Sequence, residues 1–394
     1  LNEVGEKWAW AYLASLYGED KLDFEERIDM GKSLLYDDYK NADEPYQFLA
    51  HQLELQKFVE DPTIEFKGRI HLDACNSGSQ FTSALTGDLA GCLATNVIPT
   101  ISNDGVHTRQ DAYLLVAEKA LELTRANISV ESDKEVKSSL RVLENLLVNK
   151  GRKLVKTSVM VSTYGGTARG RAEIIYGLLR EFEVDRKWIT DKNASRYGKI
   201  IGDSITGVLN GGKAFETYIH SMCMVVSKNK KPITWTTGDG FHITHRKTKE
   251  LRPKQVTLLI PGARRQTQIL KKIYSKDTNP VKMKSAISPN YVHSLDAELL
   301  RRVALRMKAA DIYDTDFIHD SFGCLPNDTD FLLQCCKDEF FQMFSLDPLA
   351  VLDNELRNQV PSTKDAQKKL DKVEYPRIAN LSIEKLFDSN WFFS

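Results

Sequence analysis

Several features that would place a chain in a class at once are missing from this sequence. It has no run of eighteen apolar residues, so we expect no membrane-spanning helix, and its first residues lack the basic and then apolar pattern of a signal peptide. No internal repeat and no low-complexity segment is visible. The six cysteines show no Cys-x-x-Cys pair and no regular spacing, which argues for a reducing cytosol and against a zinc site or a disulfide framework.

The chain also has no net charge, but its charges are unevenly distributed. It carries 54 basic and 54 acidic residues, so the balance does not by itself suggest nucleic acid. The segment from Arg246 to Lys284, however, contains twelve Lys and Arg residues against two acids, Glu250 and Asp277. A solvated face and a surface that binds a polyanion are both compatible with such a run. The length of 394 residues allows two or three domains.

Alternating apolar residues predict a β-strand that ends at an aspartate. Residues 1–60 have the spacing of helices. Apolar positions then alternate on the way to Asp73, at Ile64, Phe66, Ile70 and Leu72. The polar segment 76–79 predicts a turn, and we expect a helix from Gln80 onward.

A second aspartate lies in the segment His319–Gly323, between two short apolar stretches. This pattern predicts a strand, a tight turn and a strand, with the carboxylate of Asp320 held at the turn. On neighbouring strands of one sheet, Asp73 and Asp320 can share a pair of Mg²⁺ ions, which take a few carboxylates together with the phosphate oxygens of a substrate. The alternative interpretation is two unrelated aspartates at strand ends.

The middle of the chain predicts three helices, over residues 109–125, 133–149 and 152–164. Ser132 and Glu135 form a capping box for the second helix, which we expect to end at Gly151. The third helix ends before a pair of glycines and carries a stripe with one residue every four positions, namely Arg152, Lys156, Met160 and Tyr164. Two cations and an aromatic ring suit a nucleoside triphosphate. A solvated helix face is the alternative.

The second half of the chain predicts a β-hairpin and further helices. Residues 233–245 surround a Thr-Gly-Asp-Gly turn with two strand-like segments. A helix is expected from Asp296 to Lys308, followed by the turn around Asp320 and a mostly helical tail with an aromatic end.

Three motifs in this order resemble the single-subunit RNA polymerases of phages and mitochondria. The segment Asp73–Gln80, with its D-x-x-x-S-G-x-Q pattern, resembles motif A of that family. The segment Arg152–Gly165, R-x-x-x-K ending in Y-G, resembles motif B, and His319–Ser321 resembles motif C. Weaker resemblances, which extend the likeness over nearly the whole chain, are Gly18–Lys21, Gln110–Tyr113, Ser288–Ser294, the hairpin with the basic run in the place of a specificity loop, and the aromatic C-terminus in the place of a terminal foot.

The resemblance implies a role for each matching residue. Asp73 and Asp320, helped by the Ala74 carbonyl, are expected to bind two Mg²⁺ ions, and Lys156 to support the leaving pyrophosphate. The remaining implied roles are nucleotide binding for Arg152, Tyr164, His293, Tyr113 and Lys21, a place near the RNA 3′ end for His319, and template or promoter contacts for Arg246, Lys247, Arg264 and Arg265. Such a site works by positioning and charge neutralisation.

The resemblance also implies an α+β fold of the polymerase right-hand type, with an antiparallel-sheet palm and mostly helical fingers. The expected parts are a first palm segment at 1–108, fingers at 109–287, and a second palm segment with the foot at 288–394. No T-x-x-G-R motif precedes Asp73 in the sequence, and we expect the thumb and the N-terminal domain of that family to be absent from this chain. The chain is then either a C-terminal fragment or, as we expect, the larger catalytic chain of a two-chain phage polymerase.

The expected partners are a DNA template, the RNA product, nucleoside triphosphates and a second polypeptide that supplies the missing parts. A factor that opens the template or binds single-stranded DNA is a further expected partner. The expected location is the cytosol of a bacterial host if the chain is phage-encoded, with a mitochondrion as the alternative.

Two rival interpretations remain open from the sequence. An A-family DNA polymerase has a similar fold but usually places a glutamate in motif A, where this chain has the segment Ser77–Gln80, and a glutamate after motif C, where it has Ser321. Both departures favour ribonucleotides. The second rival is a non-catalytic nucleic-acid-binding subunit on a polymerase scaffold, against which the intact set of Asp73, Lys156 and Asp320 argues.

Overall fold

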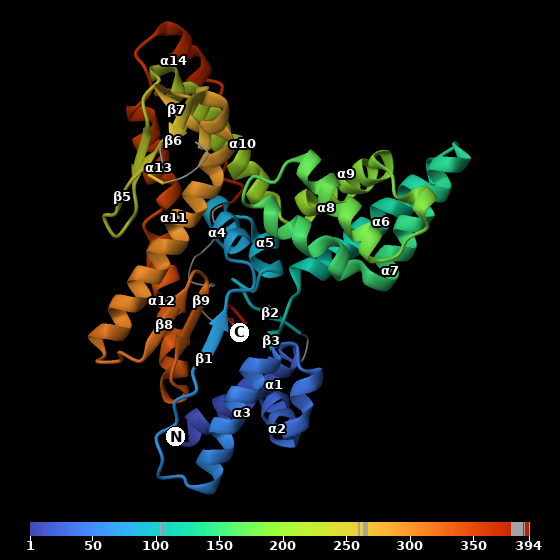
Figure 1. Cartoon of the computed structure of the whole chain (residues 1–394), viewed down its shortest axis with the longest axis vertical. Coiled ribbons are helices and arrows are strands. Elements are labelled where there is room, and N and C mark those ends of the chain that lie inside the picture. The colour runs from blue at the N-terminus through green and yellow to red at the C-terminus, as the bar shows by residue number, and fades with distance from the viewer. Residues whose placement is uncertain are drawn as a thin grey trace.

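The structure is a computed structural model that describes residues 1–102, 105, 107–258, 261–262, 267–379, 389 and 391–393. In Figure 1 the chain forms an elongated column from which a helical arm extends to one side. The fold is of the α+β class, with helices around small antiparallel sheets. Within the described residues no helix combines the length and the apolar character needed to span a membrane.

The lower end of the column consists of the helices predicted for the first sixty residues. They are α1 (Glu3–Tyr17), α2 (Phe24–Ser33) and α3 (Pro45–Glu60). Leu13, Phe48 and Leu55 are fully buried where these helices meet. Side-chain caps start the first two helices, because Asn2 accepts a hydrogen bond from Gly5 and Asp23 forms a capping box with Glu26.

A three-stranded antiparallel sheet forms the centre of the column. Its order is β1 (Ile70–Asp73), β9 (Ser321–Cys324) and β8 (Thr315–Ile318). The strand expected from Ile64 begins only at Ile70, because Phe66 leaves the alternating pattern and packs edge-on against the rings of His51 and Phe58. Leu72 and Phe322 lie opposite each other and are buried, so one face of the sheet belongs to the core.

Helices cover the buried face of this sheet and build the upper column. Two sequence predictions are wrong here: the segment 76–79 is not a turn but opens a helix capped by Asn76, and the helix expected from Asp296 starts sixteen residues earlier, at Pro280, since Pro is well tolerated in a first turn. The helices are α4 (Ser77–Thr86), α5 (Leu89–Ala94), α10 (Asn210–Val226), α11 (Pro280–Ala309), α12 (Thr329–Ser345), α13 (Pro348–Asn358) and α14 (Lys364–Leu370).

The arm has a hydrophobic core of its own. It contains α6 (Ala112–Val130), α7 (Lys134–Ser162), α8 (Ala168–Glu181) and α9 (Asp191–Val208). The predicted capping box at Ser132 is wrong, because Asp133 caps α7 through the backbone N–H groups of residues 135 and 136. The predicted separation of two helices at Gly151 agrees with the structure to within one residue: the two helical segments of α7 meet at a kink at Lys150, whose backbone is not helical (φ −140°, ψ 25°), and Gly151 packs closely on Ala117.

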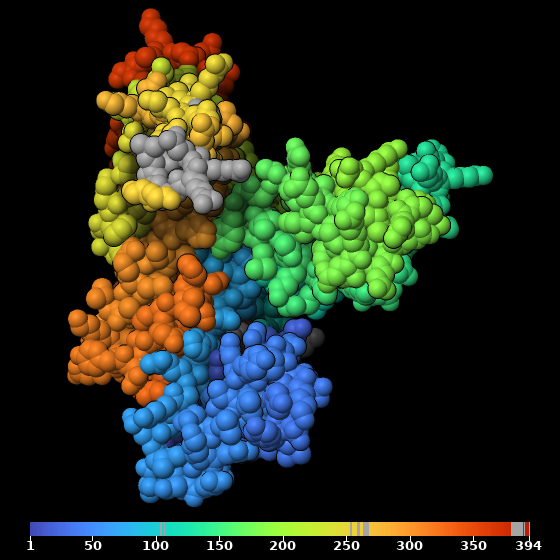
Figure 2. Space-filling view, in the orientation of Figure 1, coloured from blue at the N-terminus to red at the C-terminus, as the bar shows by residue number. Residues whose placement is uncertain are grey.

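Three two-stranded hairpins complete the described elements. They are β2 (Thr100–Ile101) with β3 (His107–Thr108), β4 (Ile233–Thr236) with β5 (His242–His245), and β6 (Thr248–Leu258) with β7 (Thr267–Thr278). The predicted hairpin at 233–245 is confirmed, with Trp235 buried in the main core. The basic run forms a separate, longer ribbon from β6 and β7. Figure 2 shows the arm standing away from the column on the viewed face.

Candidate active site

The two aspartates singled out by the sequence lie on adjacent strands. Asp73 ends β1 opposite Ser321, the first residue of β9. Ile318 pairs with Ser321, so His319 and Asp320 are the two-residue turn between β8 and β9. The backbone N–H of Ala74 donates a hydrogen bond to the Asp320 carbonyl at 3.1 Å, which holds the turn against the end of β1. Asp73 is exposed and Asp320 half-buried, so both carboxylates are accessible.

The turn is strained in a way that fixes its side chains. His319 adopts a left-handed backbone conformation, with φ 58°, which a residue with a side chain seldom takes up. The buried residues of β9 hold the turn in place on one side, because Phe322, two residues after Asp320, is packed in the core. The exposed side chain of His319 therefore stands next to Asp320 at the end of the sheet.

The C-terminal segment fastens the loop behind Asp73, and sequence reasoning found this contact only as a resemblance to a terminal foot. Ala74 forms a β-bridge with Phe393. The amide of Gln80, which is buried, donates hydrogen bonds of 3.0 Å to the carbonyls of Thr95 and Phe392. Gln80 therefore stabilises this loop by joining it to the C-terminal segment. The part of the foot at residues 380–388, 390 and 394 lies outside the described residues.

Tyr164 joins the helix of the arm to the motif that follows Asp73. Its hydroxyl lies 3.3 Å from Ser77 Oγ, and its ring stacks on His293 of α11 with centroids 4.8 Å apart. A Cβ on Gly78 would come within 3.0 Å of the Tyr164 hydroxyl and 2.7 Å of Thr163 Oγ1, so glycine is needed for this approach. The three motifs of the sequence thus converge from three separate parts of the chain.

The two cations of the stripe on α7 have different surroundings. Lys156 is exposed, and no ion pair of its side chain is present in the described structure. Arg152 donates a 2.7 Å hydrogen bond from Nε to Asp111, and its guanidinium lies over the ring of Tyr113 at 5.3 Å. Asp111, which also caps α6, was not singled out from the sequence. Arg152 is therefore already engaged, and Lys156 is the cation free to meet a phosphate.

The weaker sequence matches are brought together by Arg109. This side chain donates hydrogen bonds to the Asp20 carbonyl and carboxylate, beside the exposed Lys21. It also lies over the ring of Trp391 at 5.5 Å. Arg109 directly precedes the segment that carries Tyr113, so the Lys21 loop lies near the start of α6. The charge of Arg109 was the only signal for this role in the sequence.

Burial and the neighbouring charges shift the titration of three groups around the turn. Burial, and then the charge of Asp320, raise the pKa of Asp296 to about 6. Burial and His319 lower the pKa of His293, although Asp320 opposes the shift. Burial raises the pKa of Tyr164. Asp296 was missed as a site residue, although it follows His293 by three positions and so lies near it on α11.

The oxygen ligands near the turn suit a hard divalent cation that also binds a substrate. Among the described residues no cluster of three or more His, Cys, Asp or Glu could hold a metal ion alone. Asp73 and Asp320 instead offer two carboxylates, which fits Mg²⁺, since this ion is usually bound by one or two carboxylates together with substrate phosphates and water. The Ala74 carbonyl is adjacent in sequence to Asp73.

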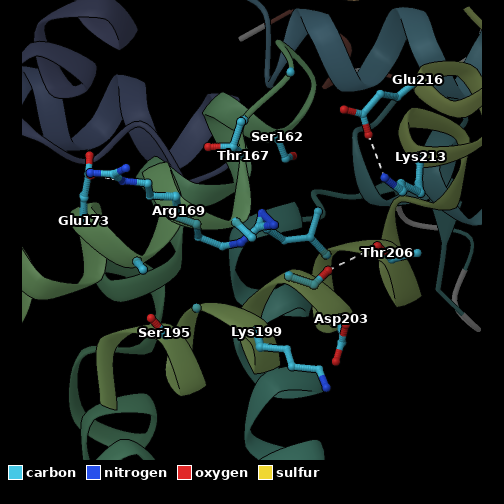
Figure 3. A pocket seen from close by; sticks show the side chains of 18 of the residues that line it. Ser162, Thr167, Arg169, Glu173, Ser195, Lys199, Asp203, Thr206, Lys213 and Glu216 are labelled. Carbon is cyan, nitrogen blue, oxygen red and sulfur yellow. Dashed lines mark hydrogen bonds and ion pairs between the residues drawn. The ribbon is translucent and has the colours of Figure 1, made fainter. Parts of the chain in front are cut away.

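A cavity of about 1060 Å³ lies just beyond Tyr164, between α8, α9, α10 and the start of α11. Figure 3 shows charged side chains around it, including Lys199 and Asp203 from α9 and Lys213 and Glu216 from α10. Arg171 also lines the cavity, and its buried Nε has no hydrogen-bond partner in the described structure. The sequence analysis did not identify this cavity, because its lining comes from segments spread over more than a hundred residues.

Two of the four promoter-contact residues expected from the sequence belong to the part of the chain that the structure describes. Arg246 and Lys247 are exposed at the base of the β6–β7 ribbon, next to its first strand. Arg264 and Arg265 lie outside the described residues. The basic run is nonetheless solvent-facing over nearly all described positions of the ribbon.

Two accessible carboxylates on adjacent strands are typical of enzymes that transfer phosphoryl groups with bound metal ions. A model of the family "DNA-dependent RNA polymerase" matches residues 1–390. The chain belongs to this family.

Named relatives agree with this assignment. A probable DNA-directed RNA polymerase of Neurospora crassa is 28% identical over 377 residues, which cover 88% of this chain and 40% of the relative. DNA-directed RNA polymerase 1, mitochondrial, of Arabidopsis thaliana is 25% identical over 421 residues, covering 100% of this chain and 40% of the relative. The chain therefore spans about 40% of the length of these relatives.

Proposed function

We propose that this chain carries the catalytic centre of a DNA-directed RNA polymerase, which transfers a nucleotide from a nucleoside triphosphate to the 3′-hydroxyl of RNA. The observation that carries the proposal is the adjacency of Asp73 and Asp320 on β1 and the β8–β9 turn, beside the Ser77–Tyr164 contact. Membership of the family supports it.

Asp73 and Asp320 would hold two Mg²⁺ ions through their carboxylates, with help from the Ala74 carbonyl. When bound, such a pair of ions stabilises the attacking and leaving oxygens of the displacement. The strained turn at His319 keeps Asp320 in place before substrate arrives, which lowers the reorganisation needed during the reaction. His319 stands next to the RNA 3′ end.

Lys156 neutralises charge on the leaving pyrophosphate, while Arg152 fixes Asp111 and the Tyr113 ring at the rear of the nucleotide site. Tyr164 and His293 form a stacked pair that borders the sugar of the incoming nucleotide. Lys21 approaches the triphosphate from the loop that Arg109 holds.

The surroundings of Tyr164 favour ribonucleotides over deoxyribonucleotides. A DNA polymerase of the A family excludes the ribose 2′-hydroxyl with an acidic side chain in motif A. Here the hydroxyl of Ser77 contacts Tyr164, and Gln80 is buried away from it in contacts with backbone carbonyls. The space beside the Tyr164 hydroxyl is thus bordered by a small neutral group.

The parts of the chain also have proposed roles at the level of domains. Residues 1–108 and 288–394 form the palm and foot, and residues 109–287 the fingers together with the β6–β7 ribbon, which contacts template or promoter DNA through its lysines and arginines. The cavity that Arg171 lines receives unpaired template nucleotides beyond Tyr164. A second polypeptide supplies the thumb and the N-terminal domain, and a template-opening or single-stranded-DNA-binding factor assists. The phage origin and the bacterial cytosol also remain predictions, whereas the polymerase of Arabidopsis thaliana to which the chain is similar bears a mitochondrial name.

Primer extension with a single-stranded template tests this proposal. The chain should be assayed alone and together with any polypeptide that co-purifies, with ribonucleoside and deoxyribonucleoside triphosphates in parallel. We expect ribonucleotide incorporation that depends on Mg²⁺ and rises when the second polypeptide is added. Preferential incorporation of deoxyribonucleotides would support the A-family alternative, and template binding without any incorporation would support a non-catalytic subunit. Robust synthesis by the chain alone would contradict the need for a partner.

A further inference from the structure

The polar face of β1 also includes a residue that precedes Asp73. Side chains alternate along a strand, so His71 and Asp73 project to the same side of β1, opposite the buried Ile70 and Leu72. The Cα atom of His71 lies about 7 Å from that of Asp73 along the strand. A strand of RNA whose 3′ end lies at Asp73 has this face as an adjoining surface.

A histidine–carboxylate pair occupies the middle of this face. His71 pairs across β9 with Gly323, and Gly323 pairs with Asp316 of β8, so the three residues lie in one line across the sheet. The Nδ1 atom of His71 is 3.4 Å from Asp316 Oδ1. A Cβ on Gly323 would lie 2.3 Å from Asp316 Oδ1 and 2.8 Å from His71 Cε1, so the pair meets only because the central residue is glycine.

This arrangement sets the orientation of the imidazole. Asp316 Oδ1 is buried, has no hydrogen-bond partner in the part of the chain that is described, and lies 3.4 Å from the Nδ1 atom of His71. A carboxylate beside one ring nitrogen favours the tautomer with the proton on that nitrogen, which leaves Nε2 as an acceptor. The His71 side chain is 28% exposed, so this acceptor is within reach of a ligand.

We propose that His71, oriented by Asp316, accepts a hydrogen bond from a ribose 2′-hydroxyl of the nascent RNA close to its 3′ end. It is then a specificity-determining residue that makes the enzyme prefer an RNA primer strand over a DNA one. The proposal rests on the proposed function, because only a polymerase places a growing strand at Asp73. A 2′-hydroxyl is the group by which a protein distinguishes RNA from DNA at a given position.

The charges on this face favour a hydroxyl over a phosphate as the partner of His71. Arg69 pairs with Asp314 at 3.1 Å and lies 3.7 Å from the second oxygen of Asp316. The cationic group nearest to His71 is therefore already shared between two carboxylates, which would repel a phosphate. A neutral hydroxyl donor meets no such repulsion and supplies the proton that Nε2 lacks.

Extension of matched primers tests the proposal with the polymerase as isolated, including any polypeptide that co-purifies. The primers are all-RNA strands and strands in which one of the last four nucleotides is replaced by its 2′-deoxy form. For the wild type we expect one deoxy substitution to lower kcat/KM about threefold to tenfold, the size of one hydrogen bond. In His71→Ala this penalty should vanish at that position only. His71→Gln, which retains an acceptor oxygen, should keep part of it.

Asp316→Asn is a second variant, expected to weaken the deoxy penalty without removing it, because it leaves His71 in place but loosens its orientation. His242→Ala, an exposed histidine on β5, is the matched control and should keep the full penalty. An unchanged penalty in His71→Ala, or an equal loss with every primer, would overturn the proposal. Absence of extension from the all-RNA primer by the wild type would instead count against the proposed polymerase function. Circular dichroism identifies any variant that fails to fold, and the remaining variants then test the proposal.

Discussion

The central sheet and the β6–β7 ribbon use antiparallel strands in opposite ways. The sheet buries Leu72 and Phe322 on one face and presents the two aspartates from its edge. The ribbon leaves large apolar side chains in water, with Leu270 69% and Tyr274 55% exposed. Its strands pair mainly with each other. The geometry of the proposed catalytic site is therefore held by a core, whereas the ribbon depends on the hydrogen bonds between its own two strands.

This difference predicts which part of the molecule has its final geometry before it binds nucleic acid. An isolated two-stranded hairpin is marginally stable in water, so a ribbon exposed on both faces gains most when it binds a partner. A turn that is anchored in a hydrophobic core needs little reorganisation when a substrate binds. Mutations in the sheet should then affect the reaction directly, whereas mutations in the ribbon should affect binding and leave folding almost unchanged.

The largest effect is expected for Asp320→Asn, which removes one charge from the proposed metal site. Nucleotide incorporation should fall by about 10³-fold or more, because roughly 4 kcal/mol of transition-state stabilisation depends on the bound ions. The fold should be kept, since Asn has nearly the same size. Single-turnover primer extension measures the loss, and filter binding of template shows whether binding persists. If the variant polymerises normally, the metal assignment is wrong.

Lys156→Ala should reduce kcat by about 10²-fold, since it removes one charge that stabilises the leaving pyrophosphate. Lys153→Ala is the matched control on the same helix, because Lys153 is also exposed but pairs with Glu181 at 2.6 Å. The control should stay close to wild type. Equal effects of both substitutions would show that general charge, and not the position of Lys156, matters.

The raised pKa of Asp296, about 6, predicts a pH-dependent stability. The folded chain binds this proton more tightly than the unfolded chain, so the contribution is fully present below about pH 4 and is lost as the pH rises through 6. Asp296→Asn should remove this loss and be more stable than wild type by about 1–3 kcal/mol at pH 7 without divalent cations. Denaturant unfolding at pH 4 and pH 7 measures it. Equal pH dependence of both proteins would contradict the assignment.

The smallest effect on folding is expected in the ribbon. Replacing Lys249, Lys254 and Lys271 by Gln should change the free energy of unfolding by no more than about 0.5 kcal/mol, since all three are exposed. The same variant should bind DNA more weakly, with a salt dependence lower by about one for each phosphate contact removed. Binding titrations at several salt concentrations test this.

The matched control neutralises three lysines at the other end of the column, Lys7, Lys32 and Lys57, which are also exposed. Their loss should leave the salt dependence of DNA binding unchanged. A similar decrease for both sets would show that overall charge accounts for the effect.

Much of the local structure followed from the sequence. The helices of residues 1–60, the hairpin at 233–245 and the turn at Asp320 follow from periodicity and turn residues, which act over a few positions. The start of the strand expected from Ile64 was wrong, because tertiary packing overrode the local pattern: Phe66 packs against aromatic rings of α3. The separation of two helices predicted at Gly151 corresponds to the kink at Lys150, and Gly151 allows close contact with Ala117.

The sequence by itself determined the chemical groups available: two aspartates, and a helix stripe with two cations and a tyrosine, in motifs that indicate a polymerase. Only the tertiary structure decided which of them meet. Helix packing pairs Arg152 with Asp111 and leaves Lys156 without an ion pair in the described structure. It also brings Asp296 close enough to Asp320 for the two charges to interact. Strand register places His71 next to Asp316, on either side of Gly323. The reason is physical: strand register and helix packing join positions hundreds of residues apart, and neither is encoded in local spacing.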